Sequence, residues 1–362
     1  MNVPKLRFKE FKDEWKKAQL SSFVNINPKN DSLPEKFIYI DLESVNNGLL
    51  TSRKIINKSE APSRAQRTII KNDILYQTVR PYQMNNLFIN SLDSTYPYIA
   101  STGYALLRTE ENPYFVYSIL HQKSFVNKVL DKCTGTSYPA ISANDLGAII
   151  VGLPSIKEQE KISRTFELLD KKIEHQFKKI EDLKLFKLCL NNRLFNGNKT
   201  IKLKDICECK SSTISLSDIE YDDGIYPIYG ADGEIKKINC YQNDKEYLAI
   251  IKDGAGVGKT IICNKKSSII STLNALIPND IPIYYFNELI NKIDFSKYIV
   301  GSGIPHIYFK DYSNEKLYLH SEKEKTLINK LFKNTIVKIE LEKNKLQLLE
   351  ALKKGLIQNM FV

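Results

Sequence analysis

The second half of the chain repeats the first. When the sequence is shifted by 166 positions, residues 135–195 align with residues 301–361 without a gap. Gly135 falls on Gly301, and both stretches end on phenylalanine. Because self-similarity over such a run is the signature of a duplicated structural unit, it constrains the fold more than any other feature.

The latter part of each repeat predicts a long helix. Apolar residues recur in steps of three and four over residues 162–194 and again over residues 328–360. Neither stretch contains proline, and Gly355 is their only glycine. This spacing, flanked by Lys and Glu, is typical of a coiled coil. Each helix has about 40 residues and spans about 60 Å. A helix of this length cannot bury its apolar stripe against one small domain, so we expect an antiparallel pair. The alternative is two independent amphipathic helices.

The ends of the first long helix are marked by residues with known capping preferences. Ser155 with Glu158 three positions later predicts a capping box. The segment Asn196, Gly197 and Asn198 predicts the end.

The segments 1–152 and 198–318 predict globular domains with short strands. Examples are Phe37–Ile40, Ala148–Val151 and Leu248–Ile251, separated by Gly, Asn, Asp and Pro turns. We therefore predict an α+β fold with a pseudo-two-fold internal repeat, in the order domain, helix, domain, helix. The predicted boundaries are 1–152, 153–197, 198–318 and 319–362.

The charge of the chain favours a polyanionic partner. Lys and Arg number 53 against 42 Asp and Glu, which gives a formal net charge of +11. Each phosphate that a cation neutralises releases counterions, so such a surplus suits nucleic acid. The alternative is a basic protein from an AT-rich genome.

The cysteines and the N-terminus predict a cytosolic protein. Segment Met1–Trp15 has no apolar core of a signal peptide, and no apolar run approaches the ~20 residues of a membrane helix. A C-x-C pair alone makes a poor zinc site, so we expect free thiols and no metal. The cysteines are Cys133, Cys189, Cys207, Cys209, Cys240 and Cys263.

The glycine-rich segment 253–260 is similar to a phosphate-binding loop but breaks its pattern. Asp253 stands where the first glycine is needed, and residues 261–264 predict a strand where a helix is required. We interpret the segment as a hairpin whose backbone can approach DNA, flanked by Lys252 and Lys259. A tight turn without a ligand is the alternative.

Other motifs do not support a catalytic centre. The segment Asn112–Phe115 is similar to the Asn-Pro-Pro-Tyr/Phe motif of adenine methyltransferases, which act on a flipped base, but one proline and a glycine-rich cofactor loop are missing. We interpret Asn112 as the N-cap and Pro113 as the first residue of a helix that extends to Leu130. The histidines His121, His175, His306 and His320 are scattered, so we expect no catalytic residue, no metal and no cofactor.

Candidate DNA contacts are Arg, Lys, amide, hydroxyl and glycine residues in expected loops. Arg80 and Gln83, after an expected strand over 73–79, offer guanine-reading and adenine-reading groups on one turn. Each residue has ordinary surface as its alternative. The candidates are Arg53, Lys54, Arg64, Arg67, Arg80, Tyr82, Gln83, Thr134, Gly135, Thr136, Ser137, Lys252, Gly254, Gly256, Lys259, Gly301, Ser302 and Gly303.

Two motifs near the middle of the chain resemble a known family. Residues 133–141, Cys-Thr-Gly-Thr-Ser-Tyr-Pro-Ala-Ile, precede residues 153–162, Leu-Pro-Ser-Ile-Lys-Glu-Gln-Glu-Lys-Ile. Together they resemble the end of a target-recognition domain and the first conserved region of type I restriction–modification specificity (S) subunits. Residues 4–15 are similar to the start of many members. The second copy, residues 319–325, lacks both the Pro and the Gln, which leaves its partner contact in doubt.

The resemblance implies a non-catalytic DNA reader. It implies two tandem target-recognition domains, separated by an antiparallel coiled coil, that each read one half of a bipartite duplex DNA target. The coiled coil would set the gap and dock two modification (methyltransferase) subunits, and restriction (helicase–nuclease) subunits would join. The partner-binding residues expected on this basis are Glu158, Gln159, Ile162, Phe166, Ile328 and Phe332. The alternative function is a dumbbell-shaped adaptor between two proteins.

Overall fold

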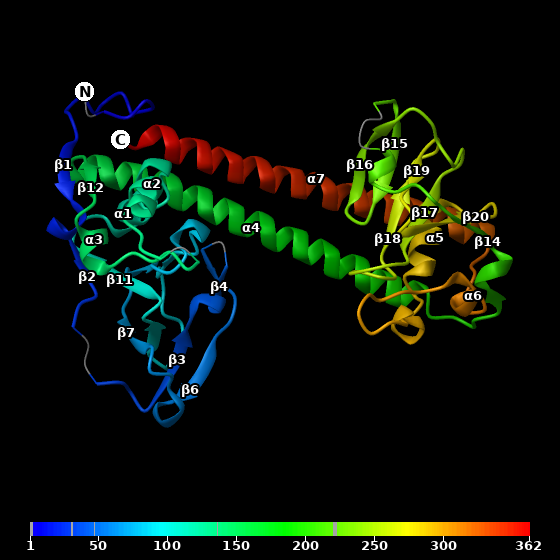
Figure 1. Cartoon of the computed structure of the whole chain (residues 1–362), viewed down its shortest axis with the longest axis horizontal. Helices are drawn as coiled ribbons and strands as arrows, with labels where there is room; N and C mark the ends of the chain where they lie inside the picture. Colours follow the sequence, from blue (N-terminus) through cyan, green and yellow to red (C-terminus); the bar gives the residue numbers. More distant parts are fainter. Residues whose placement is uncertain (1–2, 30–31, 47, 136, 220–222) are drawn as a thin grey trace. The chain divides into compact units, whose positions relative to one another are not determined.

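The chain forms two compact units that share two long helices. Unit 1 comprises Met1–Gln176 and Lys345–Val362, and unit 2 comprises Phe177–Asn344. Helices α4 (Ile156–Leu194) and α7 (Glu322–Met360), of 39 residues each, contribute to both units (Figure 1). This computed structural model describes residues 3–29, 32–46, 48–135, 137–219 and 223–362.

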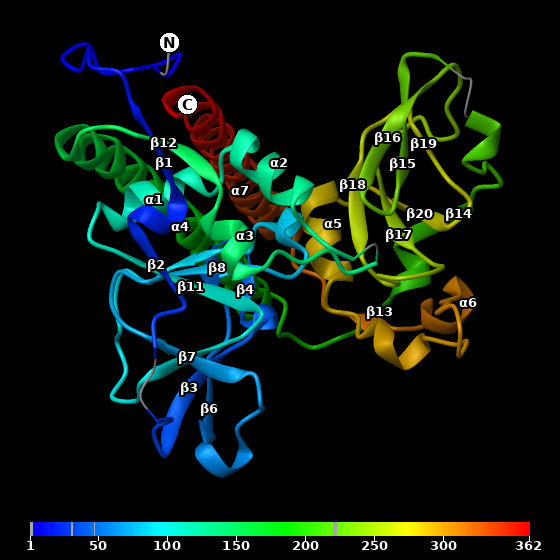
Figure 2. The ribbon, with the colours of Figure 1, turned by 60° about the vertical axis from the view of Figure 1, so that its left-hand side comes forward.

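Unit 1 has a central sheet between a second sheet and a layer of helices (Figure 2). The central sheet has the order β2 (Val24–Ile26), β11 (Tyr104–Thr109), β8 (Ile74–Gln77), β9 (Leu87–Phe88). The second sheet has the order β6 (Lys54–Asn57), β3 (Lys36–Ile40), β10 (Tyr98–Ser101), β7 (Ala65–Ile69). Short pairs are β1 (Lys16–Gln19) with β12 (Ile150–Leu153) and β4 (Val45–Asn46) with β5 (Leu49–Leu50). The helices are α1 (Pro113–Ile119), α2 (Lys123–Asp131), α3 (Ala143–Gly147), η1 (Leu20–Ser22), η2 (Leu42–Ser44), η3 (Lys58–Glu60) and η4 (Pro81–Gln83).

The apolar strand β8 explains this layering. Ile74 and Tyr76 pack with α1, α2 and the long helices, whereas Leu75 packs in the core between the two sheets. Successive side chains of a strand point to opposite faces, so a strand buried on both sides is apolar throughout. Side chains of this segment can therefore reach the surface only beyond the ends of β8.

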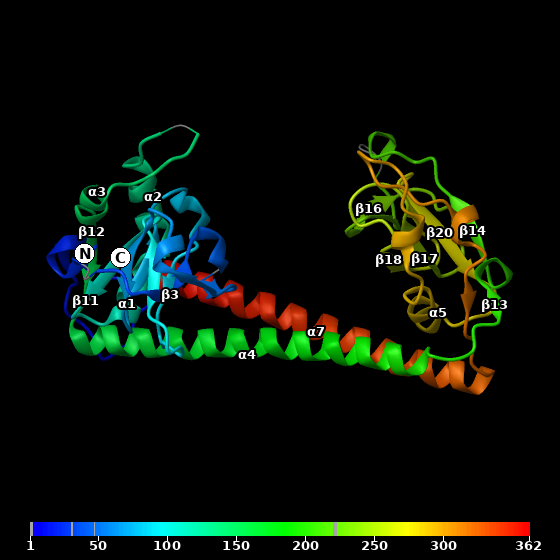
Figure 3. The ribbon, with the colours of Figure 1, turned by 90° about the horizontal axis from the view of Figure 1, so that it is seen from below.

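Unit 2 has the same kind of layering. Leu248 and Ile250 of β17 pack with α5, which lies between the central sheet and the long helices (Figure 3), and Ala249 packs against the second sheet. The central sheet has the order β14 (Cys207–Ser211), β20 (Leu273–Pro278), β17 (Tyr247–Ile251), β18 (Thr260–Cys263). The second sheet has the order β16 (Gly233–Ile238), β15 (Tyr226–Gly230), β19 (Ser268–Ile269), and β13 (Ile201–Lys202) pairs with β21 (Lys316–Leu317). The helices are α5 (Ile283–Ile290), α6 (Phe309–Tyr312), η5 (Leu203–Asp205), η6 (Ser217–Ile219) and η7 (Phe295–Tyr298).

Helices α4 and α7 contact each other within each unit and run antiparallel. In unit 1, Asp170 of α4 lies 2.6 Å from the Nζ of Lys353 on α7. In unit 2, Lys179 of α4 lies 2.5 Å from Glu342 of α7. As the residue number rises along α4, the number of its α7 partner falls.

The long helix of each repeat is confirmed, as are Asn112 as the N-cap of α1 and Pro113 in its first turn. The expected helix from Tyr114 to Leu130 is wrong, because it divides into α1 and α2. Gln122 adopts extended backbone angles (φ −71°, ψ 136°), so the chain turns there and the helix restarts.

Glu158 does not form the capping box predicted for the start of α4. Its carboxylate accepts hydrogen bonds from Nε and Nη2 of Arg7 at 2.7 and 2.8 Å. In the second copy, Glu324 does fold back and accepts hydrogen bonds from Ser321 N–H and Oγ at 3.0 and 2.6 Å. The first copy differs because the N-terminal segment supplies a guanidinium from outside the helix.

In the part of the chain that the structure describes, no helix is long and apolar enough to cross a membrane.

Candidate nucleic-acid interface

In unit 1 the fold brings two predicted DNA-contacting loops together at the end of β8. Val79 forms a β-bridge with Ala140, and the N–H of Arg80 donates to the carbonyl of Pro139 at 2.7 Å. Thr134 bridges Ala140 as well, so both lie beside the turn. We call residues 79–83, 134–135 and 137–140 the unit 1 loop pair. It contains the predicted Arg80, Tyr82, Gln83, Thr134, Gly135 and Ser137, whereas Thr136 lies outside the described residues.

A buried glutamine holds the Arg80 turn in place. Gln77, 2% exposed, donates from Nε2 to the carbonyl of Val79 and to Oε1 of Gln83, both at 2.8 Å. Its own Oε1 accepts a hydrogen bond from the N–H of Asn85 at 3.1 Å. The turn is thus fixed from within the sheet, while Tyr82 stays half exposed.

Unit 2 presents an equivalent arrangement at the end of β17. Asp253 forms a β-bridge with His306, and the N–H of Gly254 donates to the carbonyl of Pro305 at 2.9 Å. Val300 bridges His306 and closes residues 300–306 into a loop. We call residues 252–259 and 300–306 the unit 2 loop pair. It brings together the predicted Lys252, Gly254, Gly256, Lys259, Gly301, Ser302 and Gly303.

The loop pairs of the two units share their hydrogen-bond pattern. The N–H of Ile141 donates to Thr78 at 3.1 Å, and that of Ile307 donates to Lys252 at 2.9 Å. Arg80 and Gly254 therefore occupy equivalent places, and both have positive φ, 53° and 94°. Each unit thus offers two short loops, fixed to a buried strand, where small and cationic residues reach the surface.

The glycine-rich segment of unit 2 is a hairpin, as predicted. Strands β17 and β18 pair antiparallel, and no helix follows the loop within the described segment 253–263. Gly258 has φ +87°, and a Cβ there would lie 2.8 Å from the Cβ of Phe295. Close packing against Phe295 and a left-handed backbone therefore both require glycine.

In the unit 2 loop pair one acidic side chain is paired within the loops, and one lysine is exposed at the surface. The Oδ1 of Asp253 lies 2.7 Å from Nδ1 of His306, and its Oδ2 lies 3.4 Å from Nζ of Lys252. Lys259 is exposed. The acidic side chain is thus engaged within the loops, and a cation stays at the surface.

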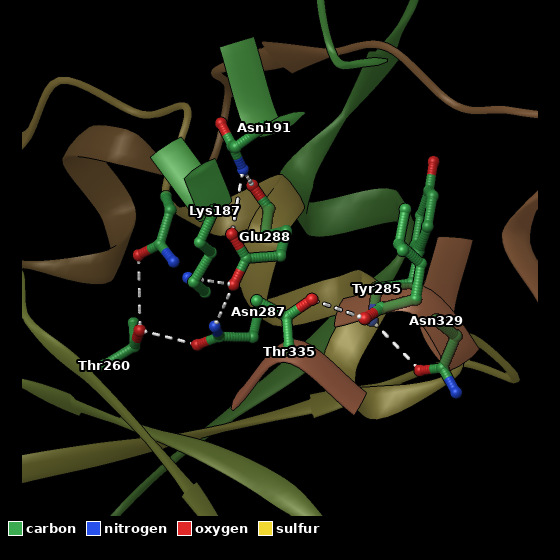
Figure 4. Close-up of polar contacts among 10 residues, drawn as sticks. Lys187, Asn191, Thr260, Tyr285, Asn287, Glu288, Asn329 and Thr335 are labelled. Atoms are coloured by element: carbon green, nitrogen blue, oxygen red, sulfur yellow. Dashed lines mark hydrogen bonds and ion pairs between the residues drawn. The ribbon is translucent and has the colours of Figure 1, made fainter. Parts of the chain in front are cut away.

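A buried ion pair fixes the unit 2 hairpin to helix α4 (Figure 4). Glu288 of α5, 1% exposed, lies 2.5 Å from the Nζ of Lys187 on α4 and accepts a hydrogen bond from Asn191 at 3.1 Å. The next residue on α5, Asn287, accepts a hydrogen bond from Thr260 at 2.8 Å. Because Thr260 directly follows the loop, α4 and the hairpin are positioned by one hydrogen-bonded chain.

The remaining predicted cations lie at the two edges of the second sheet of unit 1. Arg53 and Lys54 stand at edge strand β6 and face Asp93 at 2.8 Å and Asp41 at 4.0 Å, respectively. Arg64 and Arg67 stand at the opposite edge strand, β7. Burial lowers the pKa of Arg67, and its Nε is buried without a hydrogen-bond partner among the described residues. The sequence places these four residues in one polar stretch, but the fold separates them into two pairs.

Comparison with known proteins assigns the chain to a family. The family described as type I restriction modification DNA specificity domain matches residues 12–185 and 196–351. The chain belongs to this family.

One curated relative agrees with that assignment. The type I restriction enzyme HindI specificity subunit of Haemophilus influenzae is 27% identical over 169 residues, which are 44% of this chain and 36% of that subunit. The chain thus matches little more than a third of that relative's length.

Solved structures share the fold. The crystal structure of a type I restriction–modification system S subunit from M. genitalium has a TM-score of 0.66 at 18% identity, over 99% of both chains. A chain from a structure on complex assembly and conformational transition of the type I R-M system has a TM-score of 0.55 at 19% identity. That likeness covers 95% of this chain and 96% of the other.

The residues that carry the family motif hold the chain together internally. Gln159 donates to Glu111 at 2.9 Å and to the carbonyl of Pro154 at 3.1 Å. The expectation of direct partner contacts is corrected here, because a side chain buried within the chain offers no surface to another protein. The buried residues concerned are Glu158, Gln159, Ile162, Phe166, Ile328 and Phe332.

The second copy of the family motif achieves similar packing with different residues. Helix α5 has no side-chain N-cap of its own, since Pro282 occupies that place. Asn329 of α7 accepts hydrogen bonds from the N–H groups of Tyr284 and Tyr285 at 3.0 and 3.1 Å instead. In the second copy, which lacks the Gln of the motif, the start of α5 is therefore capped by Asn329 of α7.

Sequence reasoning missed two kinds of surface residue. Tyr138 is 63% exposed, and its ring lies 4.4 Å from the guanidinium carbon of Arg80. Its position inside a predicted DNA-contacting loop could have signalled it. Exposed apolar residues on the long helices lie outside the a/d spacing: Leu168, Phe177, Leu185, Phe186, Leu188, Leu327, Val337, Leu341, Leu348 and Leu352.

Of the two cysteines of the C-x-C pair, Cys207 is buried and Cys209 is half-buried. Burial raises the pKa of Cys207 to about 12 and that of Cys209 to about 11, so both stay protonated at neutral pH. Thiolates are the species that bind metals. All six cysteines of the chain are free.

Proposed function

We propose that the chain is the DNA-sequence-recognition subunit of a type I restriction–modification complex, and that each unit reads one half of a bipartite target. The observation that carries the proposal is the pair of loops repeated at the end of the central strand in each unit. Both pairs gather backbone N–H groups, small residues and cations, which suit the phosphates and base edges of duplex DNA.

The net charge supports duplex DNA as the ligand. At +11 the chain can neutralise several phosphates, and binding that releases counterions weakens steeply with salt. Within this proposal Arg53, Lys54, Arg64 and Arg67 contact phosphates at the periphery, while the loop pairs contact the bases.

The long helices suit a spacer. Each has 39 residues and so a length of about 60 Å at 1.5 Å per residue. Their antiparallel contacts and the periodic burial of α4 at Ile162, Phe166 and Leu169 support a coiled coil that sets the unread gap. In this proposal residues 1–152 and 198–318 are the target-recognition domains, and 153–197 and 319–362 are the spacer regions.

The exposed apolar residues of α4 and α7 suit the modification subunits. Apolar side chains such as Phe177, Phe186, Leu341 and Leu348 are between 49 and 71% exposed on otherwise charged helices. Exposed apolar groups of this kind mark protein–protein surfaces. Two modification (methyltransferase) subunits would dock there and supply the catalytic chemistry, restriction subunits would join them, and this chain would contribute only recognition.

Selection from a random duplex DNA library tests this proposal. The chain is purified with its modification subunits, and bound sequences are read at low and high salt. A motif of two short half-sites with an unread gap is expected, with affinity that falls steeply as salt rises. A contiguous motif, no motif, or salt-independent binding would contradict the proposal.

A further inference from the structure

In the unit 1 loop pair the guanidinium of Arg80 stacks on the ring of Tyr138. Arg80 is half-buried, and its guanidinium lies over the face of the exposed Tyr138 ring at 4.4 Å. Among the described residues, no carboxylate or carbonyl accepts a hydrogen bond from this guanidinium within hydrogen-bonding distance. Its N–H groups are therefore oriented by the ring and available to a ligand.

The backbone of Arg80 is held in a conformation that arginine seldom adopts. Its φ and ψ are 53° and 54°, in the left-handed region, and the equivalent residue in unit 2 is Gly254. Such a conformation is strained for a residue with a side chain and persists where the surroundings impose it, as at binding sites. Here the imposing contacts are the hydrogen bond to Pro139 and the turn closed by Gln83. A large cation thus stands where the fold itself would accept glycine.

The free groups of the turn are hydrogen-bond donors. The Oε1 of Gln83 already accepts a hydrogen bond from Gln77, so its Nε2 is the end directed to a ligand. Arg80 adds the planar N–H fork of its guanidinium. In the major groove, guanine is the base that presents two acceptors, N7 and O6, whereas adenine presents one donor and one acceptor. This favours guanine over the adenine that we expected for Gln83.

We propose that Arg80 reads a guanine in the half-site of unit 1 and that Tyr138 is the positioning residue that orients its guanidinium. This inference rests on the proposed function and adds the base class, the reading residue and its support. Tyr138 acts through Arg80, because its ring face holds the guanidinium plane and leaves the N–H edge free.

Library selection with variants of the full chain in complex with its modification subunits tests the inference. Arg80→Lys keeps the positive charge but loses the planar fork, so preference for guanine at one position should fall by roughly 5- to 150-fold. Tyr138→Ala should weaken the same preference by roughly 2- to 5-fold, and Tyr138→Phe, which keeps the ring, should restore it. The half-site of unit 2 is the internal control and should keep its bases.

The variant Arg80→Gly tests whether a loss of guanine preference could come from misfolding of the turn. Glycine adopts this backbone conformation without strain, as Gly254 does in unit 2, so the variant should fold and lose the guanine preference. If Arg80 contacts a phosphate instead, Arg80→Gly lowers affinity for all sequences and reduces the salt slope by about 0.9, without a change in base frequencies. That result, or unchanged guanine preference in Arg80→Lys, would overturn the inference. Absence of any bipartite motif with the unaltered chain would instead overturn the proposed function.

Discussion

The N-terminal segment of the chain offers a stability test with a built-in reporter. The side chain of Glu158 is 2% exposed, and its carboxylate accepts hydrogen bonds of 2.7 and 2.8 Å from Arg7. The only other donor to that carboxylate among the described residues is Nε1 of Trp15 at 3.3 Å. Trp15 is the single tryptophan of the chain and is 3% exposed, so its fluorescence reports on unit 1.

Arg7→Met should destabilise unit 1 by about 3–5 kcal/mol, because it leaves a buried carboxylate with one neutral donor. Lys161→Met is the matched control, since Lys161 joins the same N-terminal segment to the same helix through an exposed ion pair with Glu10. Exposed pairs contribute about 0–1 kcal/mol. Urea unfolding followed by Trp15 fluorescence measures both variants. If Arg7→Met costs no more than Lys161→Met, the reasoning about the buried carboxylate is refuted.

Three further predictions concern other parts of the chain. Lys187→Met leaves the buried carboxylate of Glu288 without its cation and should lower the free energy of unfolding of unit 2 by about 3 kcal/mol, as measured by urea unfolding followed by circular dichroism. The control Lys184→Met removes an exposed ion pair and should lower it by less than about 1 kcal/mol. Burial lowers the pKa of His121 to about 4, below its unfolded value of about 6.5, so the fold favours the neutral ring. Its contribution is present above about pH 6.5, and about 3 kcal/mol is lost as pH falls to about 4; His121→Phe should remove this loss from the unfolding profile. Lys259→Ala should weaken DNA binding modestly and change no nucleotide binding in calorimetric titration; ATP binding that disappears in this variant would contradict the hairpin interpretation.

The repeat made the general architecture predictable. The shift of 166 positions links Pro139 with Pro305 and Ile141 with Ile307, and the structure gives both pairs the same hydrogen bonds. The a/d spacing likewise predicted the long helices, because burial along a helix follows its period.

Equivalences outside the ungapped repeat could not be predicted. Arg80 corresponds to Gly254, which is a shift of 174 rather than 166 positions. Loops on the surface tolerate insertions, so a constant shift does not extend through them. The contact between Arg80 and Tyr138 depends on this loop geometry, and for that reason the sequence did not reveal it.

Long-range partners also escaped the sequence. Glu158 has a local pattern that predicts a capping box, but its carboxylate is bound by Arg7, 151 positions away. The a/d residues Ile162 and Phe166 were expected at a partner surface, although the same apolar spacing already predicts burial within the chain. The spacing identified the buried face of the helix correctly, but that face packs within the chain and not against a partner protein.

The proposal that the helices set the spacing between two half-sites has a direct test. One heptad is inserted after Gln176 and one after Glu342, close to the limits of the units at Gln176 and Asn344. Seven residues lengthen each helix by about 10 Å and keep the a/d register. Since base pairs lie about 3.4 Å apart, the account predicts that methylation mapping with the modification subunits finds the same half-sites with a gap longer by about three base pairs. An unchanged gap with altered bases would contradict it.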